Sequence, residues 1–225
     1  RRAGVLRPAS EAAFRRQCQD YSVTQAAMAL IRSDVIGSLL RPGYLQEART
    51  AHERGEMDAA AFKRIEDRAV NEAIALQCEA GVEVITDGEL RRYAFYGHLI
   101  DCVQGFDKFG GWAIPFRDDK GENVLLKRPV VVSRLKRKRH LCAEEFAYLR
   151  GRTEQPVKIT LVSAQQAAAY YDPKKSSDAY ATIDDYLADV VTILPEEVDE
   201  LARLGCTYVQ VDAPQYAGLI DPEIR

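Results

Sequence analysis

The sequence predicts an α/β fold in which helices alternate with short buried strands. Two observations carry this prediction. Long stretches with helical spacing of apolar residues run directly into short apolar strands, and three of those strands end in small polar or acidic residues. The helix–strand unit is the repeat of an α/β barrel or of a doubly wound sheet. Polar groups at strand ends are where barrel enzymes place their chemistry.

The clearest helix–strand unit lies between residues 58 and 86. Asp58 precedes a helical pattern that ends at Gly81, which indicates an N-capped helix with a glycine stop. The segment 82–86 then has the short apolar run of a buried strand. This unit is the strongest local support for the predicted fold.

Later segments repeat the helix–strand pattern, with less regular start and stop signals at the helix ends. A short helix over 140–151 precedes a strand at 157–161, and a long helix over 182–205 precedes a strand at 207–211. Pro195 predicts a kink or a break in the long helix. Residues 34–37 and 130–133 are further strand candidates, and residues 106–121 are expected to form a long loop or a hairpin insertion.

Composition predicts a soluble globular protein. The chain has 225 residues, of which 47% are hydrophobic and 29% are charged, and its formal net charge is -3. That charge gives no reason to expect nucleic acid or an anionic membrane as a partner, and no apolar run approaches the roughly 20 residues of a membrane span. The basic run at 134–139 is expected to be solvated, with attraction of phosphate or polyglutamate as the alternative.

Cysteine usage points to a reducing compartment. The five cysteines form no C-x-x-C pair, so we expect no disulfide framework and a cytoplasmic location. They are Cys18, Cys78, Cys102, Cys142 and Cys206.

The first 30 residues differ from the rest in charge. Within the first sixteen positions there are five arginines and a single acid, Glu11. Transit peptides have this composition, and an amphipathic extension or a segment foreign to the native protein explains it equally well. We therefore treat residues 1–30 as an N-terminal extension of uncertain origin.

Three strand ends carry the candidate chemistry. Val84-Ile85-Thr86 leads into Asp87-Gly88-Glu89, the strand at 34–37 leads into Ser38, and the strand at 207–211 leads into Asp212-Ala213-Pro214. Because the carboxyl ends of neighbouring barrel strands meet at one face, we expect these groups to converge on one site.

Taken together and in this order, the three segments resemble the cobalamin-independent methionine synthase family, and within it the short single-barrel members. The resemblance covers about residues 31–220 and includes Arg41-Pro42, Pro156–Thr160 and Gly205–Asp212. It implies a (β/α)8 TIM barrel of the methionine synthase/uroporphyrinogen decarboxylase-like type. Five predicted strands are fewer than eight, so the barrel is expected to be incomplete at the C-terminus, with residues 31–225 forming the N-terminal part of a single catalytic domain.

The resemblance implies an S-methyltransferase of methionine biosynthesis. Such an enzyme moves a methyl group from a donor such as methyltetrahydrofolate to a small thiol such as homocysteine. Family members use zinc (Zn2+), which deprotonates a coordinated thiol. By resemblance the zinc ligands are expected beyond residue 225, so no catalytic or metal-binding residue is assigned here, and a homo-oligomer stays open.

By the same resemblance, five residues are expected to bind the substrate. Glu89 and Asp212 would hold the ammonium of an amino-acid thiol, because a buried charge needs a partner. The carboxylate would be held by Ile36, Gly37 and Ser38, and Gly37 would allow close approach of the main chain. The alternatives are structural ion pairs of the two acids with Arg91, Arg92 or Lys158, and a turn-capping role for Ser38.

Ala213 departs from the family pattern, which has a glutamate directly after the aspartate of this strand end. A different thiol therefore remains an alternative, for example a sulfonate-bearing one, as in the epoxyalkane coenzyme M transferases. Lys158 and Arg41 could bind such an anion. A truncated, non-catalytic barrel is the non-enzymatic alternative.

The tripeptide His140-Leu141-Cys142 imitates a zinc-ligand pair. It follows a basic run that would repel a cation, and it opens a predicted helix in which residues i and i+2 point to different faces. We therefore expect it to be structural. His52 and His98 also lack partners at ligand spacing, and His98 follows the Glu89 strand end more closely.

Overall fold

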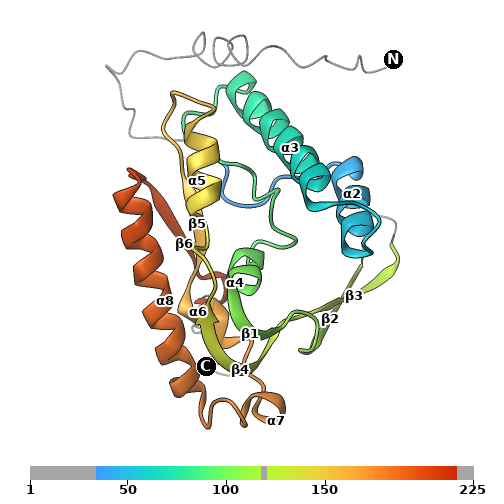
Figure 1. Cartoon of the computed structure of the whole chain (residues 1–225), viewed down its shortest axis with the longest axis vertical. Coiled ribbons are helices and arrows are strands. Elements are labelled where there is room, and N and C mark those ends of the chain that lie inside the picture. The colour runs from blue at the N-terminus through green and yellow to red at the C-terminus, as the bar shows by residue number, and fades with distance from the viewer. Residues whose placement is uncertain (1–33, 118–120, 217–225) are drawn as a thin grey trace. The chain divides into compact units, whose positions relative to one another are not determined.

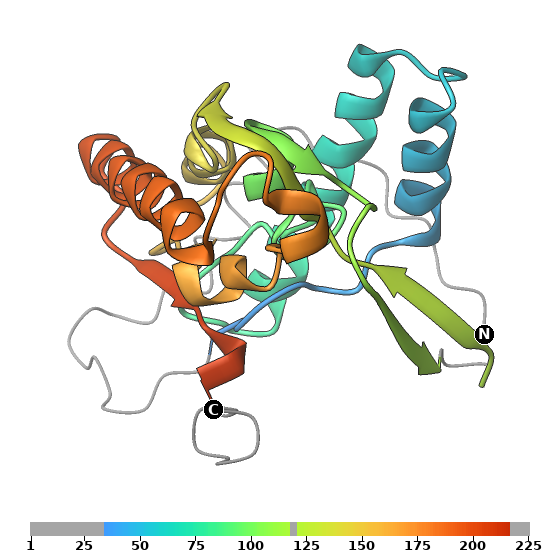
Figure 2. The ribbon, with the colours of Figure 1, turned by 90° about the horizontal axis from the view of Figure 1, so that it is seen from below.

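The computed structural model describes residues 34–117 and 121–216, which form a mixed α/β fold (Figures 1 and 2). They divide into two compact units. Unit 1 comprises residues 34–94 and Glu145–Ile159, and unit 2 comprises Phe95–Glu144 and residues 160–216. Within these described ranges the strands do not close into a barrel. The predicted extension at residues 1–30 lies outside the described residues.

Unit 1 is built on two helices that lie side by side, α2 (Gly43–Glu53) and α3 (Ala59–Glu79) (Figure 1). The predicted cap of α3 is confirmed, because the Asp58 carboxylate accepts a hydrogen bond from the main-chain N–H of Ala61 at 2.7 Å. Near the other end of α3, buried Gln77 donates to the main-chain oxygen of Thr86 at 2.8 Å and accepts from its N–H at 3.0 Å. This amide fixes the strand end at residue 86 against the helix.

The strand segments of unit 1 are short but parallel. Asp34 bridges to Val84, and Ile85 bridges to Val157. The buried ammonium of Lys158 lies 3.0 Å from the Asp34 carboxylate and so joins the first and third of these segments. The strand segments predicted at 34–37, 83–86 and 157–161 therefore pair in the expected order through single bridges, and the third continues as a regular strand from residue 159.

Unit 2 contains two antiparallel ribbons that follow the helix α4 (Gly97–Cys102). In the first ribbon, Val103 pairs with Arg137 and Asp107 with Val130; in the second, Ala113 pairs with Lys127. The second ribbon is an exposed hairpin (Figure 2), which begins within the predicted 106–121 insertion but extends beyond it to residue 127. The strands are β1 (Val103–Asp107), β2 (Ala113–Arg117), β3 (Asn123–Lys127) and β4 (Val130–Arg137).

The strand predicted at 130–133 is confirmed as the start of β4, but it pairs antiparallel with β1 and not with a parallel barrel strand. A run of valines indicates a buried strand but does not specify its partner or its direction. Nearby, the predicted helix over 140–151 is observed as α5 (Ala143–Arg150).

The rest of unit 2 joins two paired strands through helices. β5 (Ile159–Val162) pairs with β6 (Val209–Asp212). The connecting helices are α6 (Ala164–Ala168), α7 (Pro173–Ser176) and α8 (Ile183–Arg203). Across the described ranges, no helix has both the length and the apolar character needed to cross a membrane.

α8 confirms the predicted long helix and shows no break at Pro195. Thr182 and Asp185 form a reciprocal capping box at its start. The helix is not divided at Pro195, which lies inside it. A proline costs about 3 kcal/mol in a helix interior, and the buried apolar face of the helix, which includes Tyr186, Val190 and Leu201, offsets that cost.

Candidate functional site

The turn that follows the strand segment at 84–86 has an unusual main-chain conformation. Gly88 and Glu89 both have positive φ angles, +67° and +56°. A Cβ atom on Gly88 would approach Leu39 to 3.0 Å, so glycine is required there. Glutamate in the left-handed region costs about 1–3 kcal/mol. Residues held at such a cost cluster at functional sites, which makes Glu89 a strong candidate.

Local side chains support this turn. The Asp87 carboxylate accepts a hydrogen bond from the main-chain N–H of Glu89 at 2.9 Å. The Thr86 hydroxyl accepts from the N–H of Gly88 at 3.1 Å. Aspartate and threonine form this kind of short-range bond readily, so the sequence at 86–89 encodes the turn itself.

The Glu89 side chain is buried and contacts Ser38 and Arg92. Its Oε2 accepts a hydrogen bond from the Ser38 hydroxyl at 2.5 Å, and Arg92 Nη1 lies 3.3 Å from its Oε1. Two of the predicted substrate-binding residues, Ser38 and Glu89, are therefore in contact although they are 51 positions apart in the sequence. The predicted alternative, an ion pair between Glu89 and Arg92, is also present.

Arg92 is also bound by another acid, Glu145. Its Nη2 and Nε atoms donate to the Glu145 carboxylate at 2.6 and 3.0 Å in a forked arrangement. The side chains of Glu89, Arg92 and Glu145 are all buried. Arg92 is therefore shared between two buried acids, Glu89 and Glu145.

Asp87 is a second buried carboxylate in this turn, and it is not one of the five predicted substrate-binding residues. Its Oδ2 atom is buried without a hydrogen-bond partner among the described residues. Burial, followed by repulsion from Glu145, raises the pKa of Asp87 from 3.8 to about 6. A buried acid that titrates near neutrality is a recurrent feature of functional sites, and the pair of acids around Gly88 was the sequence signal for it.

An open depression of about 580 Å³ lies beside this turn in unit 1. Ser38 lines it together with Leu39, Leu40, Arg41, Gln46 and Tyr93. Next to Ser38, Gly37 has no atom within 4 Å of the position that a Cβ would occupy, and Ile36 is 75% exposed. The main chain at 36–38 is therefore accessible to a ligand, as the predicted carboxylate site requires.

Asp212, the remaining predicted site residue, belongs to unit 2. Gln210 donates a hydrogen bond to its carboxylate at 2.6 Å, and its main-chain oxygen accepts from the N–H of Ser163 at 2.9 Å. In unit 1, Lys158 pairs with Asp34. Of the three strand ends expected to converge, those at residues 38 and 89 are in contact, and the place of Asp212 in the site stays a prediction.

The His140-Leu141-Cys142 segment has a structural role, because it is bound by the fully buried Glu197. The Glu197 carboxylate accepts hydrogen bonds from the main-chain N–H groups of Leu141 and Cys142 at 2.8 and 2.7 Å, and it lies 3.1 Å from His140 Nδ1. Within 34–117 and 121–216, no group of three or more His, Cys, Asp or Glu side chains is placed to hold a metal ion. The described residues therefore do not provide a zinc site.

We expect Glu197→Ala to lower the free energy of unfolding by about 2–4 kcal/mol, because two buried main-chain donors lose their acceptor. Urea unfolding measures this effect. Glu196→Ala is the matched control, since Glu196 pairs with Arg137 near the surface, and it should cost less than about 1 kcal/mol. Equal costs for the two variants would contradict the role of Glu197.

Residues 31–222 match the family model described as "Cobalamin-independent synthase, Catalytic domain". The chain belongs to this family. The predicted resemblance is confirmed over nearly the range from which it was inferred. The chain spans about half the length of the curated relatives that it matches.

Other cobalamin-independent synthases resemble the chain in sequence and in fold. The methionine synthase of Saccharolobus solfataricus is 26% identical over 188 residues, which cover 83% of this chain and 54% of that protein. The B12-independent methionine synthase of Shewanella sp. W3-18-1, in complex with selenomethionine, superposes with a TM-score of 0.56 and 24% identity over 71% of this chain and 44% of that one. A homologue from Listeria monocytogenes gives a TM-score of 0.60 and 22% identity over 83% and 52%.

Proposed function

We propose that the chain contributes to a (β/α)8-barrel S-methyltransferase whose catalytic domain includes residues 31–225, and that the enzyme methylates homocysteine with a folate methyl donor to make methionine. Membership of the cobalamin-independent synthase family supports the reaction class. The observation that carries the proposal is the buried Glu89 carboxylate, which accepts a hydrogen bond from Ser38 at the edge of an open depression.

The two charges of an amino-acid thiol need different partners. We assign its ammonium to Glu89, with Asp212 as a second acceptor. Its carboxylate is assigned to the Ser38 hydroxyl and to the main-chain groups of Ile36 and Gly37, where the chain is open. Buried Asp87 adds negative potential beside Glu89 and favours a cationic group there.

The contacts of two cations favour an amino-acid thiol over a sulfonate-bearing one. The Lys158 ammonium pairs with Asp34. The Arg41 guanidinium donates to the main-chain oxygens of Glu89 and Arg92. Both cations that could hold a sulfonate therefore have other acceptors, whereas the acceptors needed for an ammonium are present.

Zinc is part of the proposal, although the described residues do not form a site for it. We assign its ligands to residues outside the described ranges. When bound, zinc would supply the thiolate form of the acceptor. The residues described here would bind and orient the amino-acid end of the thiol, which needs no metal.

A transfer assay tests the function. The protein produced from its complete gene is incubated with methyltetrahydrofolate, as mono- and polyglutamate, and with homocysteine or coenzyme M. We expect methionine to form, activity to fall at least about 100-fold after zinc is removed by a chelator, and activity to return when zinc is added. Methylation of coenzyme M in preference to homocysteine, or no transfer to either thiol by the zinc-loaded protein, would contradict the proposal.

A further inference from the structure

Five consecutive main-chain oxygens, those of residues 88–92, accept hydrogen bonds from a single segment, residues 39–49. The main-chain N–H of Leu39 donates to the oxygen of Gly88 at 3.0 Å. The other four oxygens are bound by two arginines. Arg41 donates to residues 89 and 92 at 3.2 and 3.0 Å, and Arg49 donates to residues 90 and 91 at 3.1 and 3.3 Å.

These contacts matter because the turn they bind contains the strained Glu89. A turn held only by its own short-range bonds could relax by moving Glu89 out of the left-handed region. Arg41 prevents this by bridging the oxygens at both ends of the turn, residues 89 and 92. The planar fork of a guanidinium suits such a bridge, and a lysine ammonium does not reproduce it.

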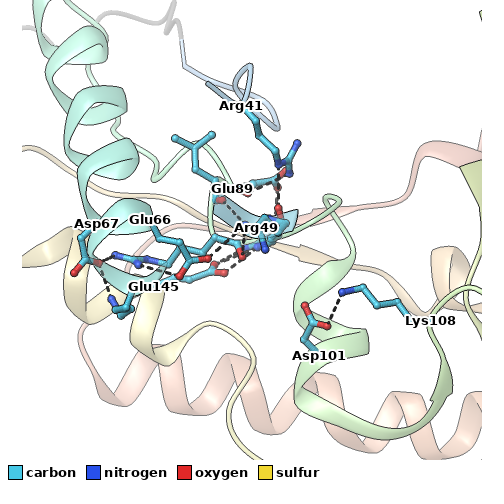
Figure 3. A network of polar contacts seen from close by, with 12 residues as sticks. Arg41, Arg49, Glu66, Asp67, Glu89, Asp101, Lys108 and Glu145 are labelled. Carbon is cyan, nitrogen blue, oxygen red and sulfur yellow. Dashed lines mark hydrogen bonds and ion pairs between the residues drawn. The ribbon is translucent and has the colours of Figure 1, made fainter. Parts of the chain in front are cut away.

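Bringing the two arginines to one turn has an electrostatic cost. The pKa of Arg41 is lowered first by burial and then by the nearby charge of Arg49. Arg49 is compensated in part by Glu66, 3.4 Å away (Figure 3). The two guanidiniums are compensated further by the main-chain oxygens of residues 89–92. Two guanidiniums that had no function beyond contact with solvent would move apart, because like charges repel. Binding of both Arg41 and Arg49 to one turn therefore indicates that they hold its conformation.

We propose that Arg41 and Arg49 are positioning residues, which hold the turn 88–92 so that Glu89 presents its carboxylate to the ammonium of the substrate. Neither arginine needs to touch the ligand in this role. The inference rests on the proposed function for the identity of the ligand, whereas the dependence of the Glu89 conformation on the two arginines stands independently of it.

The first test needs no ligand. Crystal structures are determined for the ligand-free wild-type protein and for Arg41→Lys, with Arg68→Lys as the control because Arg68 pairs with Glu72 on the exposed side of α3. We expect Glu89 to leave the left-handed region and to lose its contact with Ser38 in Arg41→Lys alone. An unchanged Glu89 in Arg41→Lys would overturn the proposal. If that variant does not fold, Arg49→Lys replaces it with the same expected result.

The second test measures coupling. The dissociation constant for L-methionine is determined for wild type, Arg41→Lys, Glu89→Gln and the double variant. We expect Arg41→Lys to weaken binding roughly 10-fold in the wild-type background and less than about 2-fold once Glu89 is replaced, because an effect transmitted through Glu89 disappears with it. A purely structural role for Arg41 would weaken binding equally in both backgrounds and would overturn the proposal.

The two tests separate this inference from the proposed function. A wild-type protein that binds no L-methionine would refute the proposed function, and the ligand-free structures would still decide whether the arginines position Glu89. Conversely, methionine binding with an unchanged Glu89 in Arg41→Lys would support the function and overturn the positioning role.

Discussion

Replacement of Glu89 by glutamine is expected to weaken the binding of L-methionine by about 10- to 100-fold, because a charge-assisted bond to the ligand ammonium becomes a neutral one. Isothermal titration calorimetry on the wild type and on Glu89→Gln measures the change. The fold should survive, since Arg92 keeps its forked bond to Glu145 and the glutamine oxygen can still accept from Ser38.

The matched control for this experiment is Glu72→Gln. Glu72 is a glutamate on the exposed part of α3 that accepts from Tyr44 and Arg68, so its replacement should leave methionine binding unchanged. Equal affinities for the wild type and Glu89→Gln would show that Glu89 does not bind the ammonium, and the two binding constants together exclude a general effect of lost charge.

Replacement of Asp87 by asparagine is expected to stabilise the protein at pH 7 by about 2–3 kcal/mol. The pKa of Asp87 is raised from 3.8 to about 6 in the folded protein, first by burial and then by Glu145. A raised folded-state pKa contributes stability that is fully present below about pH 4 and is lost as the pH rises through 6. The wild type should therefore match the variant near pH 3.5 and fall behind it above pH 6.

Urea unfolding at a series of pH values between 3.5 and 7.5 measures this difference. Asp101→Asn is the control, because Asp101 is half-exposed and pairs with Lys108, and its replacement should change the free energy of unfolding by less than about 1 kcal/mol. A constant offset between wild type and Asp87→Asn across the whole range would contradict the assignment. A carboxylate retained at such a cost to stability is consistent with a role in binding a cation.

The helices were predictable because their signals are local. Asp58 lies next to the helix that it caps, and Thr182 does the same for α8. The effect of Pro195 was not predictable in the same way, because the long-range burial of the α8 face outweighs a local preference. The pairing of β4 with β1 could not be predicted either, because the pattern of apolar residues in a strand does not specify its partner.

The candidate site was likewise predictable only in part. Family resemblance placed Ser38 and Glu89 together, and the structure confirms their contact. It did not indicate Asp87, whose importance depends on a buried and unpartnered oxygen. Nor could it show that Arg41 and Arg49 bind main-chain oxygens more than 40 positions away, because the acceptors of such bonds carry no sequence signature. Contacts between segments that are distant in the sequence could be identified only from the structure.

The most direct test of the account is a crystal structure of the protein, produced from its complete gene, with L-selenomethionine. Anomalous scattering locates the selenium and so fixes the orientation of the ligand. We expect the ligand ammonium within hydrogen-bond distance of the Glu89 carboxylate and the ligand carboxylate beside Ser38. A ligand bound elsewhere, or one whose carboxylate faces Glu89, would contradict it.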